Sequence, residues 1–168
     1  RFEVREADSR SLKTFIANGL VAYRPRVDWP LKISDNYATI LFLNGSGKDL
    51  DLKVQTYALI ASNGSLEGKT VIGSYATIII DGDLLGILKS NSYMNLIITG
   101  DLVGEVETKS YAMIVLQGKL KGKVEMNRSR LYVEGFTSRA TLSQVTGAGE
   151  IYLSESDLAE GPQEIGQL

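Results

Sequence analysis

The chain has 168 residues and a formal net charge of −2, from 18 Lys and Arg against 20 Asp and Glu. This is the size of one domain with a sizeable core, and the charge does not suggest a protein that binds nucleic acid or membrane surfaces. The absence of cysteine and histidine excludes disulfides, thiolate metal sites and cysteine nucleophiles, together with the commonest general base and metal ligand.

Residues 1–30 do not share the pattern of the rest of the chain, and we expect them to cap one end of a repetitive domain. A short helix is predicted over 10–18, ended by Gly19, and a strand over 20–23. A stack of repeats needs such a cap because its uncovered terminal coil would be an open sheet edge.

The centre of the chain is an 18-residue repeat, clearest in the four units 56–73, 74–91, 92–109 and 110–127. The columns that recur in register are Tyr57, Tyr75, Tyr93 and Tyr111; Gly64, Gly82, Gly100 and Gly118; Leu66, Leu84, Leu102 and Leu120; and Gly68, Gly86, Gly104 and Gly122. A fixed short period means that each unit buries its apolar face only against its neighbours, so the units must stack.

Within each unit, apolar residues alternate with polar ones. In the second unit the predicted inward set is Ala76, Ile78, Ile80, Gly82, Leu84, Gly86 and Leu88. Period-2 alternation predicts strands, and because the period is even the same side stays inward in every coil. The paired glycines are expected at corners, where they would allow positive φ and close approach of neighbouring backbones.

The predicted fold is therefore all-β: a single-stranded β-solenoid with about 18 residues per coil and faces of roughly six residues. We place the β-helix domain at 31–156, with six to seven coils between Lys32 and Ser154, and a polar tail at 157–168. The repeat is irregular at its ends, because the step from Tyr37 to Tyr57 is longer than the repeat by two residues. The unit that begins near Arg130 is short by one residue, and 147–153 is predicted as a last strand.

One outward face combines a tyrosine column with an aliphatic column. The candidate interaction residues are Tyr57, Tyr75, Ile79, Tyr93, Ile97, Tyr111 and Val115. A contiguous apolar stripe on an exterior needs an explanation, whereas scattered apolar residues do not. Two explanations stand: the tyrosines stack at a corner while the N-terminal helix covers the aliphatic column, or the face binds a partner or another copy.

The other outward faces carry charges that favour ladders of ion pairs. Asp101 is expected beside Lys119, and Glu105 beside Lys123, one coil apart. Opposite charges facing each other across strands contribute about 0.2–1 kcal/mol each.

Nothing in the sequence forms a catalytic constellation, and we expect no enzyme activity, no cofactor and no metal. The inner residues also step by six, as in hexapeptide-repeat left-handed β-helices, but the activities of that family rest on histidines. Polysaccharide lyases on right-handed β-helices use clustered acids, for which Asp81, Asp83 and Asp101 are the candidates here. Coils this short and regular provide no cleft for a sugar chain.

The segments GDLLGIL, GDLVGEV and GKLKGKV, within 56–127, share the pattern Gly-x-Leu-x-Gly-x-Leu/Val. In this pattern the chain resembles the bactofilins, bacterial cytoskeletal proteins with a right-handed β-helix of similar coil length that assemble end to end without nucleotide. The resemblance implies a right-handed rather than left-handed helix, a bacterial cytoplasmic protein and self-assembly.

Three hypotheses of function follow. The first is a non-catalytic structural or scaffolding protein that self-assembles, with itself as partner. The second is a monomeric module that binds another protein through the outer Tyr/Ile residues, and the third is a carbohydrate-active β-helix. No apolar run is long enough to cross a bilayer, so we expect no membrane span.

Overall fold

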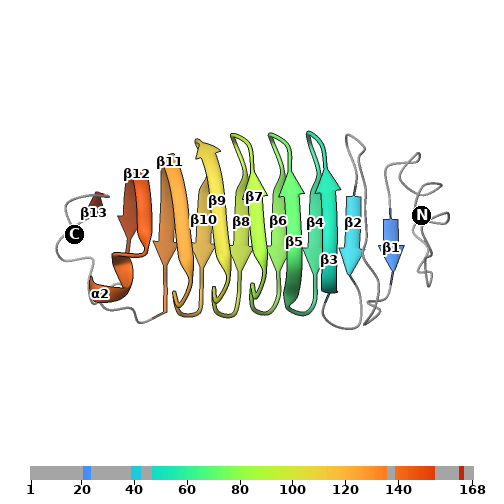
Figure 1. The fold of residues 1–168 in the computed structure, drawn as a ribbon, viewed down its shortest axis with the longest axis horizontal. Coiled ribbons are helices and arrows are strands. Elements are labelled where there is room, and N and C mark those ends of the chain that lie inside the picture. Colours follow the sequence, from blue (N-terminus) through green and yellow to red (C-terminus); the bar gives the residue numbers. More distant parts are fainter. Residues whose placement is uncertain (1–20, 24–38, 43–46, 136–138, 154–162, 165–168) are drawn as a thin grey trace.

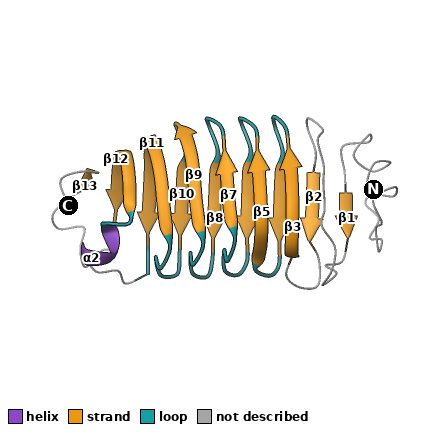
Figure 2. Cartoon of the chain, in the orientation of Figure 1, coloured by secondary structure: helices purple, strands orange, loops and turns teal. Residues whose placement is uncertain are grey.

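The chain folds into a β-solenoid, seen in a computed structural model that describes residues 21–23, 39–42, 47–135, 139–153 and 163–164 (Figure 1). Its coils follow one another along the longest axis of the molecule, and strands dominate (Figure 2). About five turns, each an 18-residue coil, form the regular part. The predicted six to seven coils also count partial turns at both ends, where some residues lie outside those described.

Each coil has three sides, and all strands between coils run parallel. The first side is built by β1 (Val21–Tyr23), β2 (Thr39–Phe42), β4 (Leu59–Ser62), β6 (Thr77–Ile80), β8 (Asn95–Ile98), β10 (Met113–Leu116) and the later parts of β11 (Lys123–Val133) and β12 (Val145–Tyr152). The third side is built by β3 (Gly47–Val54), β5 (Leu66–Ile72), β7 (Ile87–Ser90), β9 (Glu105–Ser110) and the earlier parts of β11 and β12.

The second side is much shorter and pairs only through single bridges. These bridges join the leucine column that the sequence repeats, from Leu66, where β5 begins, to Leu84, Leu102 and Leu120.

The register between coils follows the repeat of the sequence. In the regular part, pairing partners such as Thr77 and Asn95 are one full repeat apart. Both predicted irregularities are present. Thr39 pairs with Leu59, a step two residues longer than the repeat, and Met113 pairs with Arg130, a step one residue shorter.

The core is a set of columns that run along the inside of the stack. One column passes through seven coils with every side chain fully buried: Ile40, Ile60, Ile78, Leu96, Ile114, Leu131 and Ile151. The apolar side chains predicted to face inward are buried, which confirms the inward assignment. Ser90 and Thr108 are buried as well, and the Ser90 hydroxyl donates to Thr108 Oγ1 at 2.8 Å.

The paired corner glycines serve close approach of backbones, and most of them are only half-buried. A Cβ placed on Gly104 would lie 1.9 Å from the carbonyl oxygen of Gly86, and one on Gly122 would lie 1.8 Å from that of Gly104. The prediction of positive φ is confirmed at Gly68, with φ of 94°, but is wrong for most of the paired glycines: Gly86, Gly100, Gly104, Gly118 and Gly122. In every regular coil the left-handed conformation is found instead at the repeated tyrosine, with φ of 58–62° at Tyr57, Tyr75, Tyr93 and Tyr111.

The last turn departs from the repeat. The short helix α2 (Arg139–Leu142) stands between β11 and β12, where earlier coils have the second side, and it buries Leu142 completely. In the predicted tail, β13 (Gln163–Glu164) pairs antiparallel with β12, unlike the parallel strands of the coils. The predicted N-terminal helix over 10–18 lies outside the described residues, and the handedness stays a prediction.

Candidate interaction face

The four repeated tyrosines form a stacked ladder on the outside of the solenoid. Successive ring centroids are 5.0, 4.9 and 5.2 Å apart, and the ring planes differ by 10°, 1° and 24°. Each tyrosine is 46–51% exposed. The rings superimpose because every tyrosine has the same left-handed backbone, held by its N–H, which donates to the coil that follows: Tyr75 N to Ser92 O at 3.1 Å, and Tyr93 N to Ser110 O at 2.9 Å.

The aliphatic column lies on the same side of the coil. Ile79 and Ile97 are neighbours in register and are 38% and 36% exposed, whereas Val115 is half-buried. The column continues beyond Val115 into Tyr132 and Tyr152, whose rings stack at 4.7 Å. The structure thus brings all seven predicted residues to one side of the solenoid.

A third column between these two completes the face. It consists of Leu59, Thr77, Asn95 and Met113, of which Leu59 and Met113 are 36% and 43% exposed. We call the outward side chains of 57–61, 75–79, 93–97 and 111–115 the Tyr/Ile face. It contains no charged side chain. Leu59 was not among the predicted residues of this face, although its position two residues after Tyr57 identifies it as an outward residue.

Charges appear where the Tyr/Ile face ends. Arg128 takes the next left-handed position after Tyr111, with φ of 47°, and its carbonyl oxygen accepts the N–H of Tyr111. Beside it, Arg130 lies 4.0 Å from the carboxylate of Glu150. These groups, with Tyr111 and Met113, line an open depression of about 550 Å³.

Tyr132 stacks on Tyr152, and Arg130 faces Glu150 across the same pair of strands. The hydroxyl of Tyr152 donates to the carboxylate of Glu150, which raises the pKa of Tyr152. A hydrogen bond with Tyr132 raises the pKa of Arg130. The end of the face is therefore a polar cluster of aromatic and charged groups.

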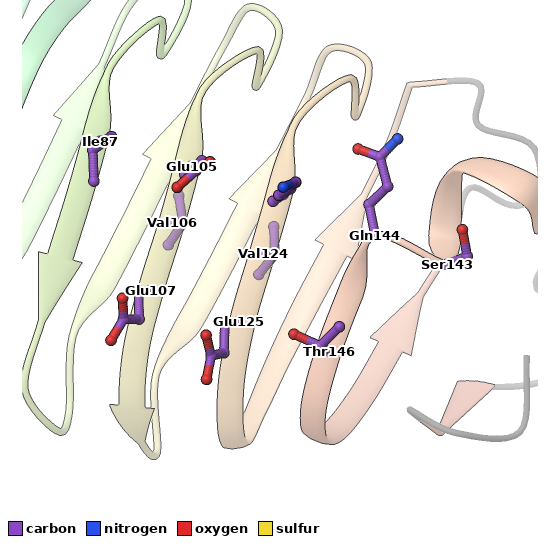
Figure 3. Close-up of a pocket in the computed structure, with 10 residues that line it drawn as sticks. Ile87, Glu105, Val106, Glu107, Val124, Glu125, Ser143, Gln144 and Thr146 are labelled. Atoms are coloured by element: carbon purple, nitrogen blue, oxygen red, sulfur yellow. The ribbon is translucent and has the colours of Figure 1, made fainter.

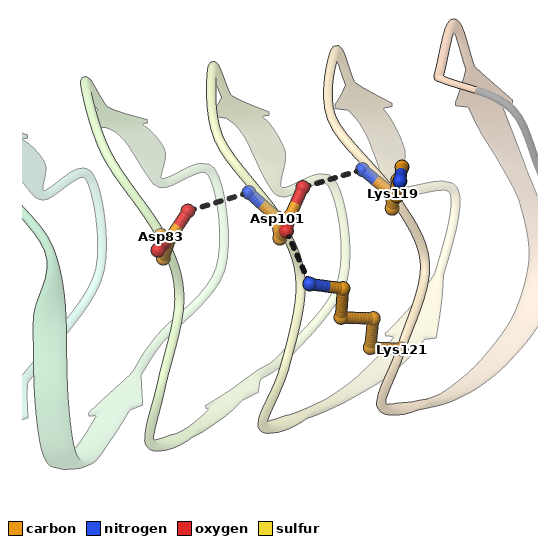
Figure 4. Close-up of polar contacts among 4 residues, drawn as sticks. All are labelled: Asp83, Asp101, Lys119 and Lys121. Atoms are coloured by element: carbon orange, nitrogen blue, oxygen red, sulfur yellow. Dashed lines mark hydrogen bonds and ion pairs between the residues drawn. The ribbon is translucent and has the colours of Figure 1, made fainter.

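The corner between the first and second sides holds a ladder of side-chain oxygens that accept main-chain N–H groups (Figure 4). Ser65 Oγ accepts from Asp83 N at 3.0 Å, Asp83 Oδ1 from Asp101 N at 2.7 Å, and Asp101 Oδ1 from Lys119 N at 2.8 Å. These side chains replace the strand pairing that the short second side lacks. Asp101 does lie next to Lys119, as predicted, but its ion pair is with Lys121, at 2.8 Å.

The electrostatics of this corner follow from those contacts. The Lys119 N–H and then the Lys121 ammonium group hold the pKa of Asp101 below its ordinary value. The same ion pair raises the pKa of Lys121. Both oxygens of Asp101 are thereby engaged within the fold.

The third side carries further charges. Lys123 pairs in register with Glu105, as predicted, and Lys89 forms an ion pair with Glu107 at 3.2 Å. Glu107 and Glu125 lie on neighbouring strands beside an open pocket of about 380 Å³ that extends to the last turn (Figure 3).

Within the described ranges, no group of three or more acidic side chains is placed to hold a metal ion. In the same part of the chain, no helix is long and apolar enough to span a bilayer. No family model, curated protein or solved structure shows significant similarity to the chain.

Proposed function

We propose that this protein is a non-catalytic structural protein, a bactofilin-like scaffold whose copies associate with one another. The observation that carries the proposal is the Tyr/Ile face, a contiguous, uncharged and exposed surface along four coils. Exposed apolar patches of this kind mark interaction sites. A second copy suits the face because no charge is buried when two such faces meet.

The size of the face indicates weak, concentration-dependent association. Four segments spaced by about 4.8 Å, each of about five residues with a rise of about 3.3 Å, give a flat footprint of roughly 300 Å². A standard interface takes about 800 Å² from each partner. One pair of faces should therefore associate reversibly, and stable assembly would need contacts between several coils or several copies.

A twofold axis along the solenoid gives the better fit between two faces. It places the tyrosine column of one copy against the aliphatic column of the other, so that large rings meet smaller side chains such as Ile79 and Ile97. A twofold axis across the solenoid would instead place tyrosines against tyrosines. We therefore favour two solenoids side by side and parallel.

A pair of double variants tests the proposal. The change of Ile79→Ser with Ile97→Ser should shift the protein to monomers in sedimentation velocity across a concentration series. The matched control is Leu85→Ser with Val103→Ser, because these residues are similarly exposed, at 42% and 43%, but lie on the second side. Equal loss of association in both double variants would argue against the Tyr/Ile face as the contact.

The same face supports a second candidate, a monomeric module that binds a different protein. The depression beside Tyr111 is also lined by Arg128 and Arg130. It favours a partner whose surface carries an acidic group next to an apolar strip. A wild-type chain that stays monomeric at high concentration, and binds a partner only when Tyr93 and Ile97 are intact, would favour this candidate over self-assembly.

A further inference from the structure

The tyrosine ladder has a chemical property that does not depend on self-association. Its four phenol rings lie face to face, 4.9–5.2 Å apart, and each is about half exposed. We propose that Tyr57, Tyr75, Tyr93 and Tyr111 form a site of oxidative cross-linking, where hydrogen peroxide acting through a haem peroxidase joins the rings of consecutive coils.

The reaction balances with that oxidant alone. Each of two neighbouring phenols loses one electron and one proton, and the two phenoxyl radicals form a carbon–carbon bond between the ring carbons next to the hydroxyls. The hydrogens on those carbons then move to the two oxygens, which restores both phenols. The net change is the loss of two hydrogen atoms to form one dityrosine, while one hydrogen peroxide is reduced to two waters.

The fold supplies the proximity that this coupling needs. Main-chain hydrogen bonds and a shared left-handed φ keep each ring beside its neighbour, so a radical on Tyr75 always has Tyr57 and Tyr93 within one coil spacing. Stacked rings must tilt about the Cβ–Cγ bond before their carbons meet. Half exposure leaves room for this, and the ring planes of Tyr93 and Tyr111 already differ by 24°.

The expected product is a covalent staple across coils. Each dityrosine would close a loop one repeat long between positions that are already neighbours, so it should restrict the unfolded chain more than it strains the folded one. We expect cross-linking to raise the melting temperature of the intact chain without changing its far-UV circular dichroism.

The sequence makes the test direct, because trypsin separates the four tyrosines. The peptides that carry them are 54–69, 70–89, 90–109 and 110–119. Dilute protein is treated with peroxidase and peroxide, chains that remain monomeric on a denaturing gel are digested, and linked peptides are identified by mass spectrometry. The stacked pair Tyr132 and Tyr152 lies on two other peptides and is scored separately.

Two double variants with equal numbers of tyrosines provide the control. Tyr57→Phe with Tyr111→Phe leaves the adjacent pair Tyr75 and Tyr93, and should keep the link between 70–89 and 90–109. Tyr75→Phe with Tyr93→Phe leaves tyrosines three coils, or about 14 Å, apart, and should lose intrachain links in this column. Phenylalanine preserves the stacked ring in both variants.

Links between neighbouring coils within one chain, lost only in the second variant, would support the proposal. Links found only between chains, or equal intrachain yields in both variants, would overturn it. Absence of links in the wild-type column under conditions that oxidise free tyrosine would overturn it as well, whatever the variants show. The outcomes for links within one chain do not depend on whether copies self-associate, because only chains that remain monomeric on the gel are digested.

Discussion

At the scale of single residues, the tyrosine ladder balances backbone strain against ring stacking. A non-glycine residue in the left-handed region costs about 1–2 kcal/mol, and a stacked aromatic pair contributes about 0.5–1.5 kcal/mol beyond its buried area. Interior tyrosines such as Tyr75 and Tyr93 each stack on two neighbours. Stacking can therefore offset most of the strain, which explains how tyrosine holds a position where glycine would be expected.

The inward assignment predicts a sharp difference between two adjacent residues. Leu102→Asp would place an unpaired charge at a fully buried position and should cost about 5 kcal/mol or more, enough to unfold the domain. Thermal unfolding followed by circular dichroism measures the effect. Val103→Asp, at the next position and 43% exposed, is the control and should melt close to the wild type. A Leu102→Asp protein with unchanged melting would refute the assignment.

The corner glycines predict a second sensitivity. Gly104→Ala would place a Cβ 1.9 Å from the carbonyl oxygen of Gly86, so the two coils would have to separate locally. We expect a loss of about 2–4 kcal/mol, comparable to a severe packing defect. Urea denaturation measures it, and a stability within about 0.5 kcal/mol of the wild type would show that the coils are not in close contact at this corner.

At the scale of elements, the strands and their buried sides were predictable from the sequence wherever the repeat is strict. Alternation identified the buried side of every strand in the repeat, because an even period keeps side chains such as Leu84 and Leu102 facing inward. It did not predict α2, which replaces the second side in a turn where the repeat is lost. Nor did it predict that Arg128 continues the tyrosine column, because the residue there is not a tyrosine, although the predicted step one residue shorter than the repeat leads from Tyr111 to Arg128.

The corner carboxylates were predicted only in part. Charge complementarity placed Asp101 near Lys119, but the main bond is to the main-chain N–H of that lysine. A backbone donor carries no sequence signal, so the pattern could not show it. The candidate face was predicted more completely, since its columns follow directly from the period.

The Asp101 ladder predicts a dependence of stability on pH. The fold lowers the pKa of Asp101 from 3.8, chiefly through the Lys119 N–H and then through Lys121. Its stabilising effect is therefore complete above the unfolded pKa and is lost as the pH falls through the lower, folded value. Asp101→Asn keeps an acceptor oxygen but loses the charge.

The difference in the free energy of unfolding between wild type and Asp101→Asn should be measurable at pH 7. It should shrink as the pH falls below about 4. Because Lys121 is largely exposed, we expect the difference to be small and to decrease with salt. Urea titrations at several pH values test this. A difference that grows toward acid pH would contradict the sign of the shift.

At the scale of the whole molecule, the repeat determines how outward side chains are arranged. Each coil contacts only its neighbours, so stability is close to a sum of similar terms along the stack. Because the repeat places equivalent outward side chains next to one another in successive coils, they form columns. Moderately exposed residues such as Ile79 and Ile97 thereby form a continuous face. We therefore propose that copies of the chain, if they associate, do so through the Tyr/Ile face.

The most direct test of this account is light scattering of the intact chain across a concentration series, with negative-stain microscopy of the same samples. We predict a mean mass that rises with concentration and particles in which solenoids lie side by side. A mass that stays at one chain, 18.3 kDa, over the whole series with only single particles in the images would contradict self-association.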